Sequence, residues 1–377
     1  MIMKDLVLDI VLNNSWEDVL NIMSERKIKV KEKGNLAIFN YDIDADFNDE
    51  LVCQCRGIII DKHEKKVVCR GFDKFFNFSE PYAVEIDWNN ASVQEKIDGS
   101  IIKLYHYSDT WHWATNGMID ASDASVADGL MVDSFQSIIE GCKNYPFIKK
   151  LCNTLNKSNT YIFELVSPFN RVVISYNESM FYHIGTRNNY TGEEYDIDIG
   201  VIKPKQFPLN TLNDCIVAAS LINQGHEQIE TEGFVVVDKD FNRIKIKSPE
   251  YVFMHHNINN YAITIKRIVD LLSDEDFNLD SFLNQFPEYI ERFDAIKKLI
   301  DDFYAECINE MNGARLMYAK CGDRRKVWEE FGLNKETGFI AMRAVGNDIP
   351  VEELLDRIEK KHLVKHIRNA LEGDDAL

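Results

Sequence analysis

A change in hydrophobic periodicity near residue 255 divides the chain into two parts. Before residue 255, the chain contains short apolar runs that are separated by polar and turn residues. Examples are Leu36 to Tyr41, Tyr161 to Val166 and Gly233 to Val237. Runs of this kind are typical of strands in antiparallel sheets. After it, apolar residues recur with a helical period up to Leu371. The sequence therefore predicts an α+β domain over residues 1–254 with antiparallel sheets, followed by an all-α domain over residues 255–377.

The composition is that of a globular protein whose surface as a whole repels polyanions. The chain has 377 residues, 45% of them hydrophobic, and a formal net charge of −19 at pH 7. Nucleic acid could still bind to a local basic groove. No run of about 18 apolar residues is present, so no membrane partner is expected. The eight cysteines lack Cys-x-x-Cys pairs, which favours free thiols in a reducing cytoplasm.

One lysine lies in a tight turn between two predicted strands, in the stretch Glu95-Lys96-Ile97-Asp98-Gly99-Ser100. The Asp-Gly pair favours a turn that holds Lys96 between two sheet edges. A free lysine amine has a pKa of about 10.4 and is a weak nucleophile at neutral pH, so a reactive lysine needs neighbouring cations or a metal. A solvated turn lysine is the alternative, because such turns also occur in ordinary hairpins.

Three more charged residues lie within predicted strands. Glu164 interrupts the apolar run Tyr161 to Val166, and a buried carboxylate costs several kcal/mol unless it is hydrogen-bonded, paired or bound to a metal. Lys245 and Lys247 point to one face of their strand because side chains alternate with period two. An exposed sheet face explains this pair of like charges, and a bound polyanion is the functional alternative.

Together, these motifs resemble one family of covalent nucleotidyltransferases. Cys-Arg-Gly-Ile, Lys-Phe-Phe-Asn, Lys-x-Asp-Gly-Ser, Phe-Glu-x-Val-x-Pro-x-Asn-Arg, Glu-Gly-x-Val and Lys-Ile-Lys-Ser occur in this order and look like the RNA ligase 1 family of T-even-type bacteriophages. The stretch from Cys321 to Lys326 is also similar to that family. The resemblance implies a nucleotidyltransferase domain and an ATP-dependent RNA ligase acting on single-stranded RNA or a broken tRNA anticodon loop. It further implies a monomer in the cytoplasm of an infected bacterium.

The resemblance also implies roles for individual residues. Lys96 would attack the α-phosphate of ATP, giving lysyl-AMP and pyrophosphate. Arg56 and Lys74 would orient the outgoing phosphates, while Lys245 and Lys247 would contact the α-phosphate.

Other positions would bind the nucleotide or magnesium. Glu164 would bind the ribose or a metal-bound water, and further nucleotide contacts are implied for Tyr41, Asp98, Gly99, Glu232 and Tyr251. Mg²⁺ would be held by Glu232 and by the acid pair Asp274 and Glu275, although a helix cap explains that pair equally well. One departure is Asn116-Gly117, where the family usually has a basic residue before the glycine.

Several alternatives stay open. A DNA ligase or a guanylyl-transferring capping enzyme would share the motifs, but the sequence shows helices in place of an OB-fold after Lys247. A catalytically silent RNA-binding protein is a third possibility. In the helical part, Lys361, Lys365 and Arg368 form a basic stripe that fits either a solvated face or RNA contact. Tyr182 and Ile184 are candidates for stacking on adenine.

Two local predictions complete the set. The segment from Val172 to Tyr176 is predicted as a strand, and the segment from Val351 to Leu371 as one helix.

Overall fold

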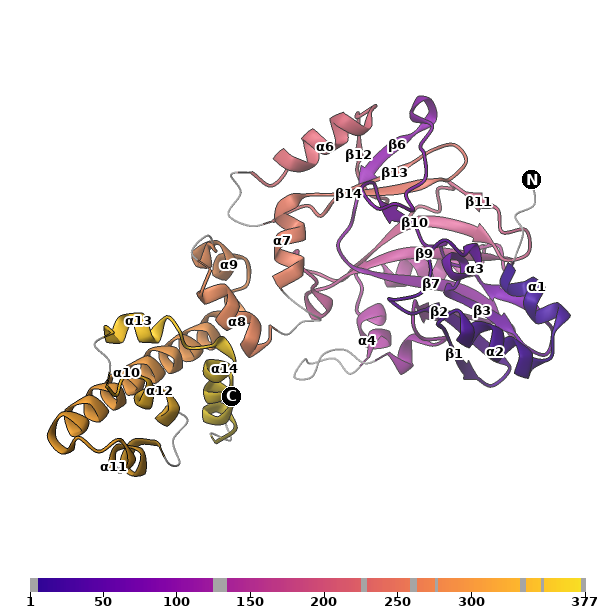
Figure 1. Ribbon diagram of the computed structural model, residues 1–377. Coiled ribbons are helices and arrows are strands. Elements are labelled where there is room, and N and C mark those ends of the chain that lie inside the picture. Colours follow the sequence, from indigo (N-terminus) through magenta and orange to yellow (C-terminus); the bar gives the residue numbers. More distant parts are fainter. Residues whose placement is uncertain are drawn as a thin grey trace. The chain divides into compact units, whose positions relative to one another are not determined.

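The computed structural model describes residues 6–124, 134–224, 229–257, 263–274, 277–332, 337–346 and 349–373 of the chain. The chain forms two compact units, Met1–His256 and Asn257–Leu377. Each unit is described by itself (Figure 1).

Three sheets form the framework of the first unit. The first has the order β1-β2-β3-β4, the second β11-β10-β9-β7-β8 and the third β12-β6-β13-β14-β5. Neighbouring strands are antiparallel except β14 and β5, which pair in parallel. The predicted α+β fold with antiparallel sheets and a helical C-terminal part is thus confirmed. The strands are β1 Ile28–Lys33, β2 Leu36–Tyr41, β3 Arg56–Asp61, β4 Lys66–Cys69, β5 Phe76–Asn77, β6 Ser92–Glu95, β7 Ser100–Tyr107, β8 Thr110–Thr115, β9 Asn159–Val166, β10 Met180–Asn188, β11 Glu194–Tyr195, β12 Gln206–Phe207, β13 Gly233–Val237 and β14 Arg243–Lys247.

Helices and sheets stack in layers that bury most strand faces (Figure 1). One face of the first sheet packs against α1 and α2, and its other face packs against β7 and β8 of the second sheet. The second sheet is covered by α4 and α5, and the third by α6. The inner face of the third sheet is left facing the second sheet. The helices are α1 Leu6–Asn13, α2 Trp16–Glu25, α3 Glu50–Gln54, α4 Phe135–Glu140, α5 Tyr145–Leu151, α6 Leu212–Leu221 and α7 Pro249–Asn257, with short 3₁₀ turns at Trp88–Asn90, Ala121–Asp123 and Pro168–Asn170.

The segment from Val172 to Tyr176 is not a strand, so that prediction is wrong. Its apolar residues are buried, which produced the strand-like pattern, but its backbone bonds go elsewhere. The N–H groups of Val173 and Ile174 donate to the Asp98 carboxylate, at 2.9 and 2.7 Å, and not to a neighbouring strand. The Asp98 carboxylate thus accepts the hydrogen bonds that a neighbouring strand would accept in a sheet.

In its described residues, the second unit consists of helices around the long helix α10. They are α8 Ile265–Leu272, α9 Leu279–Gln285, α10 Ile290–Cys321, α11 Arg324–Val327, α12 Gly338–Arg343, α13 Val351–Leu355 and α14 Lys360–Gly373, with a 3₁₀ turn at Pro287–Tyr289 and a π-helical turn at Trp328–Gly332. The single helix predicted from Val351 to Leu371 is wrong, because the chain leaves the helical path between α13 and α14. No helix in the described parts of the chain is both long and apolar enough to span a bilayer.

Candidate functional site

The functional site lies between the third sheet and the second. Strand register places Gln94, Val235 and Lys245 in one row across β6, β13 and β14. Since side chains alternate along a strand, Lys247 projects on the same face as Lys245. Next to that row, the backbone N–H of Lys96 donates to the carbonyl oxygen of Gly233 at 2.9 Å. Lysines from two strands therefore reach the same space.

A cavity of about 510 Å³ occupies this space. Six of the residues predicted from the sequence line it: Arg56, Lys96, Gly99, Glu164, Lys245 and Lys247. Of the other predicted site residues, five belong to the first unit but do not line the cavity, namely Tyr41, Lys74, Asp98, Glu232 and Tyr251; Asp274 is in the second unit, and Glu275 lies outside the described residues. The remaining wall is partly apolar and aromatic, as a site for a nucleoside would be, and consists of Phe72, Phe75, Gln94, Glu95, Ile97, Ser100, Ile101, Thr115, Asn116, Gly117, Ala124, Phe135, Ile184, Pro204, Val235 and Arg243.

Lys96 is held by a buried carboxylate. Its Nζ lies 2.7 Å from Oε2 of Glu232, and Nζ of Lys247 lies 2.8 Å from Oε1 of the same residue. Burial alone would lower the pKa of Lys96, but the carboxylates of Glu232 and Glu164 outweigh it, so the pKa of Lys96 is raised. Without a ligand, Lys96 is therefore a charged ammonium group whose proton must leave before the amine can act as a nucleophile.

Within the described part of the chain, two other basic residues at the cavity, Arg56 and Lys245, have no carboxylate in ion-pair contact. Both lie over the ring of Phe75, at 5.1 and 4.7 Å. Burial, followed by the charges of Arg56, Lys96, Lys74 and Lys247, lowers the pKa of Lys245 to about 7. Clustered cations without counter-ions favour a bound polyanion over a solvated sheet face.

Glu164 reaches the cavity from the central strand β9. The turn carrying Lys96 comes close to this strand because residue 99 is glycine: a Cβ there would overlap the carbonyl oxygen of Leu165 and lie 3.2 Å from Cγ of Glu164. Burial raises the pKa of Glu164 to about 7, an effect that Lys96 opposes and Glu232 reinforces. Gly99 thus brings the turn that bears Lys96 close to this carboxylate.

Asp98 and Tyr251 lie behind the cavity and make no part of its wall. Oδ1 of Asp98 accepts a hydrogen bond from the Tyr251 hydroxyl at 2.7 Å, while Oδ2 accepts from the backbone N–H groups of Val173 and Ile174. These hydrogen bonds from Tyr251, Val173 and Ile174 hold the Asp98 carboxylate and so support the turn that bears Lys96.

Lys74 and Tyr41 also lie beside the cavity and not in its wall. Nζ of Lys74 lies 5.1, 4.7 and 5.3 Å from the ring centres of Tyr41, Phe47 and Phe76. This aromatic surrounding stabilises the ammonium group without neutralising it. The charge of Lys74 still acts at the cavity, since it contributes to the lowered pKa of Lys245.

The predicted magnesium ligands do not form one cluster within a unit. Glu232 is in the first unit and Asp274 in the second, and Glu275 lies outside the described residues. The described residues contain no group of three His, Cys, Asp or Glu side chains arranged to hold a metal ion. A metal–nucleotide complex would fit Glu232 and Glu164 together with the basic residues Arg56 and Lys245. A carboxylate that is released from its lysine partners becomes a hard oxygen ligand for the metal.

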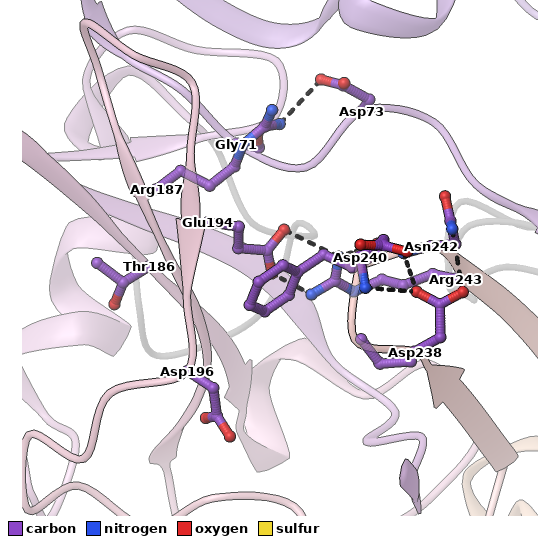
Figure 2. Close-up of polar contacts among 12 residues, drawn as sticks. Gly71, Asp73, Thr186, Arg187, Glu194, Asp196, Asp238, Asp240, Asn242 and Arg243 are labelled. Carbon is purple, nitrogen blue, oxygen red and sulfur yellow. Dashed lines mark hydrogen bonds and ion pairs between the residues drawn. The ribbon is translucent and has the colours of Figure 1, made fainter. Parts of the chain in front are cut away.

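Sequence reasoning missed Arg243, which lines the cavity in the same alternating series as Lys245 and Lys247. The period-two rule that paired those lysines also includes Arg243, so the signal was present. Figure 2 shows its guanidinium facing the Glu194 carboxylate, with Nη1 and Oε2 2.9 Å apart. Its charge lies 4.4 Å from the ring centre of Phe72. Of the two adenine-stacking candidates, Ile184 lines the cavity and Tyr182 does not.

A cavity lined by lysines, arginines and a buried carboxylate between two antiparallel sheets has the chemistry to receive a nucleotide. The profile of the family described as RNA ligase matches residues 54–251, which is more than half of the chain. The chain belongs to this family, and the resemblance drawn from its motifs is confirmed.

Known relatives carry names of the same kind. An RNA ligase of Rhodothermus phage RM378 is 27% identical over 366 residues, covering 80% of this chain and 81% of that protein. A protein of Autographa californica nuclear polyhedrosis virus, provisionally named a bifunctional polynucleotide kinase/RNA ligase, is 31% identical over 287 residues. That match covers 71% of this chain but 40% of the viral protein, so the chain spans less than half of this relative. A solved archaeal ATP-dependent RNA ligase aligns with a TM-score of 0.47 and 12% identity over 78% of this chain and 83% of that one.

Proposed function

We propose that the protein is an ATP-dependent RNA ligase that joins a 5′-phosphate to a 3′-hydroxyl end through a lysyl-AMP intermediate. The observation that carries the proposal is the position of Lys96, at the wall of a cavity that also presents Arg56 and Lys245 as cations without counter-ions. The RNA ligase family and the phage relative support RNA as the substrate. Single-stranded RNA or a broken tRNA loop is the proposed natural substrate.

In the first step, Nζ of Lys96 attacks the α-phosphorus of ATP. A nitrogen–phosphorus bond forms, the bond from the α-phosphorus to the bridging oxygen of the β-phosphate breaks, and pyrophosphate leaves with the electron pair. Glu232 is the nearest acceptor for the amine proton, at 2.7 Å. Lys245 and Lys247 stabilise negative charge on the α-phosphate oxygens, which is the main contribution a protein makes to phosphoryl chemistry.

The remaining side chains bind and orient. Arg56, backed by Lys74, directs the outgoing phosphates, and the apolar residues Ile184 and Val235 offer faces for the base. Glu164 holds the ribose or an ordered water, and Asp98 with Tyr251 keeps the lysine turn in place. A divalent cation, for which Glu232 is the proposed ligand, supplies charge neutralisation at the phosphates when bound. After adenylation, AMP passes to the 5′-phosphate and the 3′-hydroxyl displaces it.

The test is label transfer from α-labelled ATP in the presence of Mg²⁺, followed by denaturing electrophoresis. We expect the wild-type protein to retain label and Lys96→Ala to retain none, because the variant lacks the nucleophile. Lys203→Ala is the matched control, since Lys203 pairs with Asp196 outside the cavity and should label normally. Label that survives in Lys96→Ala would refute the assignment. Transfer from GTP but not ATP would favour a capping enzyme, and RNA binding without any adduct would favour a silent binding protein.

A further inference from the structure

Lys103 is a buried cation that the proposed mechanism does not use. It lies in β7 with 0% of its surface exposed, and its Nζ donates to the carbonyl oxygen of Gly57. Among the described residues, no carboxylate lies within ion-pair distance of it. An amine buried against a neutral partner is costly for the folded protein. An apolar side chain at this position would avoid the cost, so we expect the amine of Lys103 to have a function of its own.

Lys103 lies in a slot formed by two glycines. A Cβ on Gly57 would be 2.5 Å from Nζ of Lys103 and 2.6 Å from the carbonyl oxygen of Asn116. A Cβ on Gly71 would be 3.2 Å from Cδ of the lysine. Gly57 also has φ of +80°, a conformation that favours glycine. The slot therefore fits this side chain closely, and the amine sits where three chain segments meet.

Each of these three segments contributes a wall residue to the cavity. Arg56 precedes Gly57, Phe72 follows Gly71, and Asn116 is itself part of the wall. Lys103 does not line the cavity, so it lies directly behind the wall at the end where Arg56 is. The two side chains are close enough to interact: burial lowers the pKa of Lys103, the Cys69 thiol opposes this shift, and the charge of Arg56 adds to it.

We propose that Lys103 is a positioning residue for the outgoing phosphates of ATP: its bond to the Gly57 carbonyl fixes the backbone of β3 and so holds the Arg56 guanidinium in the cavity. This inference rests on the proposed function, because it assigns the phosphate-leaving end of the same site. Arg56 depends on its backbone for its position, since among the described residues its guanidinium contacts the Asp73 carbonyl oxygen, at 3.4 Å, and the Phe75 ring.

Because Lys103 lies behind Arg56, its loss should affect some reaction steps and spare others. ATP and pyrophosphate engage Arg56 through the phosphates that leave, whereas a pre-adenylated RNA carries no such leaving group. Loss of Lys103 should therefore weaken reactions of ATP and pyrophosphate while sparing the sealing of pre-adenylated RNA. A general loss of structure would reduce both kinds of step equally.

The experiment compares wild type with Lys103→Met, which fills the slot without a donor or a charge. Three quantities are measured: kcat and KM for lysyl-AMP formation from ATP, calorimetric binding of inorganic pyrophosphate, and sealing of pre-adenylated RNA to a 3′-hydroxyl strand. We expect KM for ATP and the pyrophosphate dissociation constant to rise about tenfold, with sealing changed less than about twofold.

Tyr105→Phe is the matched control. Tyr105 is buried two residues further along β7, and its hydroxyl donates to the carbonyl oxygen of Ile119 at 3.1 Å, away from the cavity. This variant also loses one buried bond to a backbone carbonyl, but it should leave KM for ATP unchanged. If Lys103→Met does not fold, Lys103→Gln, whose amide is too short to reach Gly57, carries the same comparison with the same expected result.

The outcomes separate the two proposals. Unchanged ATP and pyrophosphate parameters in Lys103→Met, or an equal loss in all three measurements, would overturn the role of Lys103. A wild-type protein that forms no adduct would instead refute the ligase assignment. The pyrophosphate titration would still test Lys103 in that case, because it requires no reaction.

Discussion

Lys245 and Glu164 both change their charge near neutral pH. The pKa of Lys245, about 7, results from burial and from neighbouring cations, and the pKa of Glu164, also about 7, results from burial. Below pH 7 the lysine is charged and the carboxyl is neutral, which favours a bound polyanion. Above pH 7 the lysine is neutral and the carboxylate is charged, which opposes it. Both groups therefore change the charge of the cavity in the same direction.

We predict that the cavity binds a non-hydrolysable ATP analogue more weakly at pH 8 than at pH 6, and that Lys245→Met removes part of this dependence. A group that must be protonated for binding contributes about tenfold per pH unit above its pKa. Calorimetric titration of wild type and variant with the analogue at both pH values measures the effect. Protonation of the analogue's own phosphates changes both proteins' affinities equally, so it cancels when the two are compared. Lys239→Met, in the loop before β14, is the control. Parallel pH profiles for wild type and Lys245→Met would contradict the prediction.

Local rules indicate where some site residues lie, whereas the contacts that join distant residues leave no local signal in the sequence. The alternation of a strand brings Lys245 and Lys247 to one face, and an Asp-Gly turn holds Lys96 at the sheet edge. By contrast, the bond between Asp98 and Tyr251 joins residues far apart in the chain, and no local pattern indicates it. The sequence does not single out Lys103, because its partner Gly57 comes from a different sheet.

At the scale of elements, buried ion pairs connect sheets that share no strand. Glu194 of β11 in the second sheet pairs with Arg243 of β14 in the third, and both side chains are 9% exposed. Arg187 of β10 pairs with Asp73, in the segment that follows the first sheet, at 2.9 Å (Figure 2). Because the cavity lies between the second and third sheets, the pair of Glu194 and Arg243 fixes part of its width.

We predict that Glu194→Ala lowers the free energy of unfolding by about 3 kcal/mol, because it leaves Arg243 buried without its counter-ion. Denaturation by urea measures this change. Asp196→Ala is the matched control: Asp196 lies two residues away, is 76% exposed and pairs with Lys203 at the surface, so its loss should cost less than about 1 kcal/mol. Equal costs for the two variants would show that the buried pair does not connect the sheets.

Elements with strong periodicity were predicted more closely than those whose backbone bonds leave the regular pattern. The strand predicted from Leu36 to Tyr41 is β2, and the strand predicted from Gly233 to Val237 is β13. The errors occur where another acceptor competes, as at Val173 beside Asp98, or where a helix breaks without proline or glycine, as between α13 and α14. Neither event changes the hydrophobic pattern on which the prediction depends.

At the scale of the whole molecule, the residues around the cavity all belong to the unit Met1–His256. That unit has its own hydrophobic cores on both sides of the first sheet and beneath α6. The second unit has a separate core, formed by α10, α11 and α12. The cavity and the framework that supports it are thus contained in one part of the chain.

We predict that a fragment of residues 1–256 forms lysyl-AMP when incubated with α-labelled ATP and Mg²⁺, at a rate within about tenfold of the full chain. Label transfer measures the rate, and circular dichroism confirms that the fragment is folded. The same fragment carrying Lys96→Ala is the control. A folded fragment that takes up no label would show that adenylation requires the second unit.

The hydrogen bond between Tyr251 and Asp98 couples the movement of α7 to that of the turn that bears Lys96. Tyr251 is in the first turns of α7, the helix at which the first unit ends, and Asp98 is two residues from Lys96. The hydroxyl and the carboxylate are buried and hydrogen-bonded at 2.7 Å, so the start of α7 and the lysine turn move together. A spectroscopic probe at the exposed Phe253, on the same helix, would therefore register a displacement of the lysine turn without occupying the cavity.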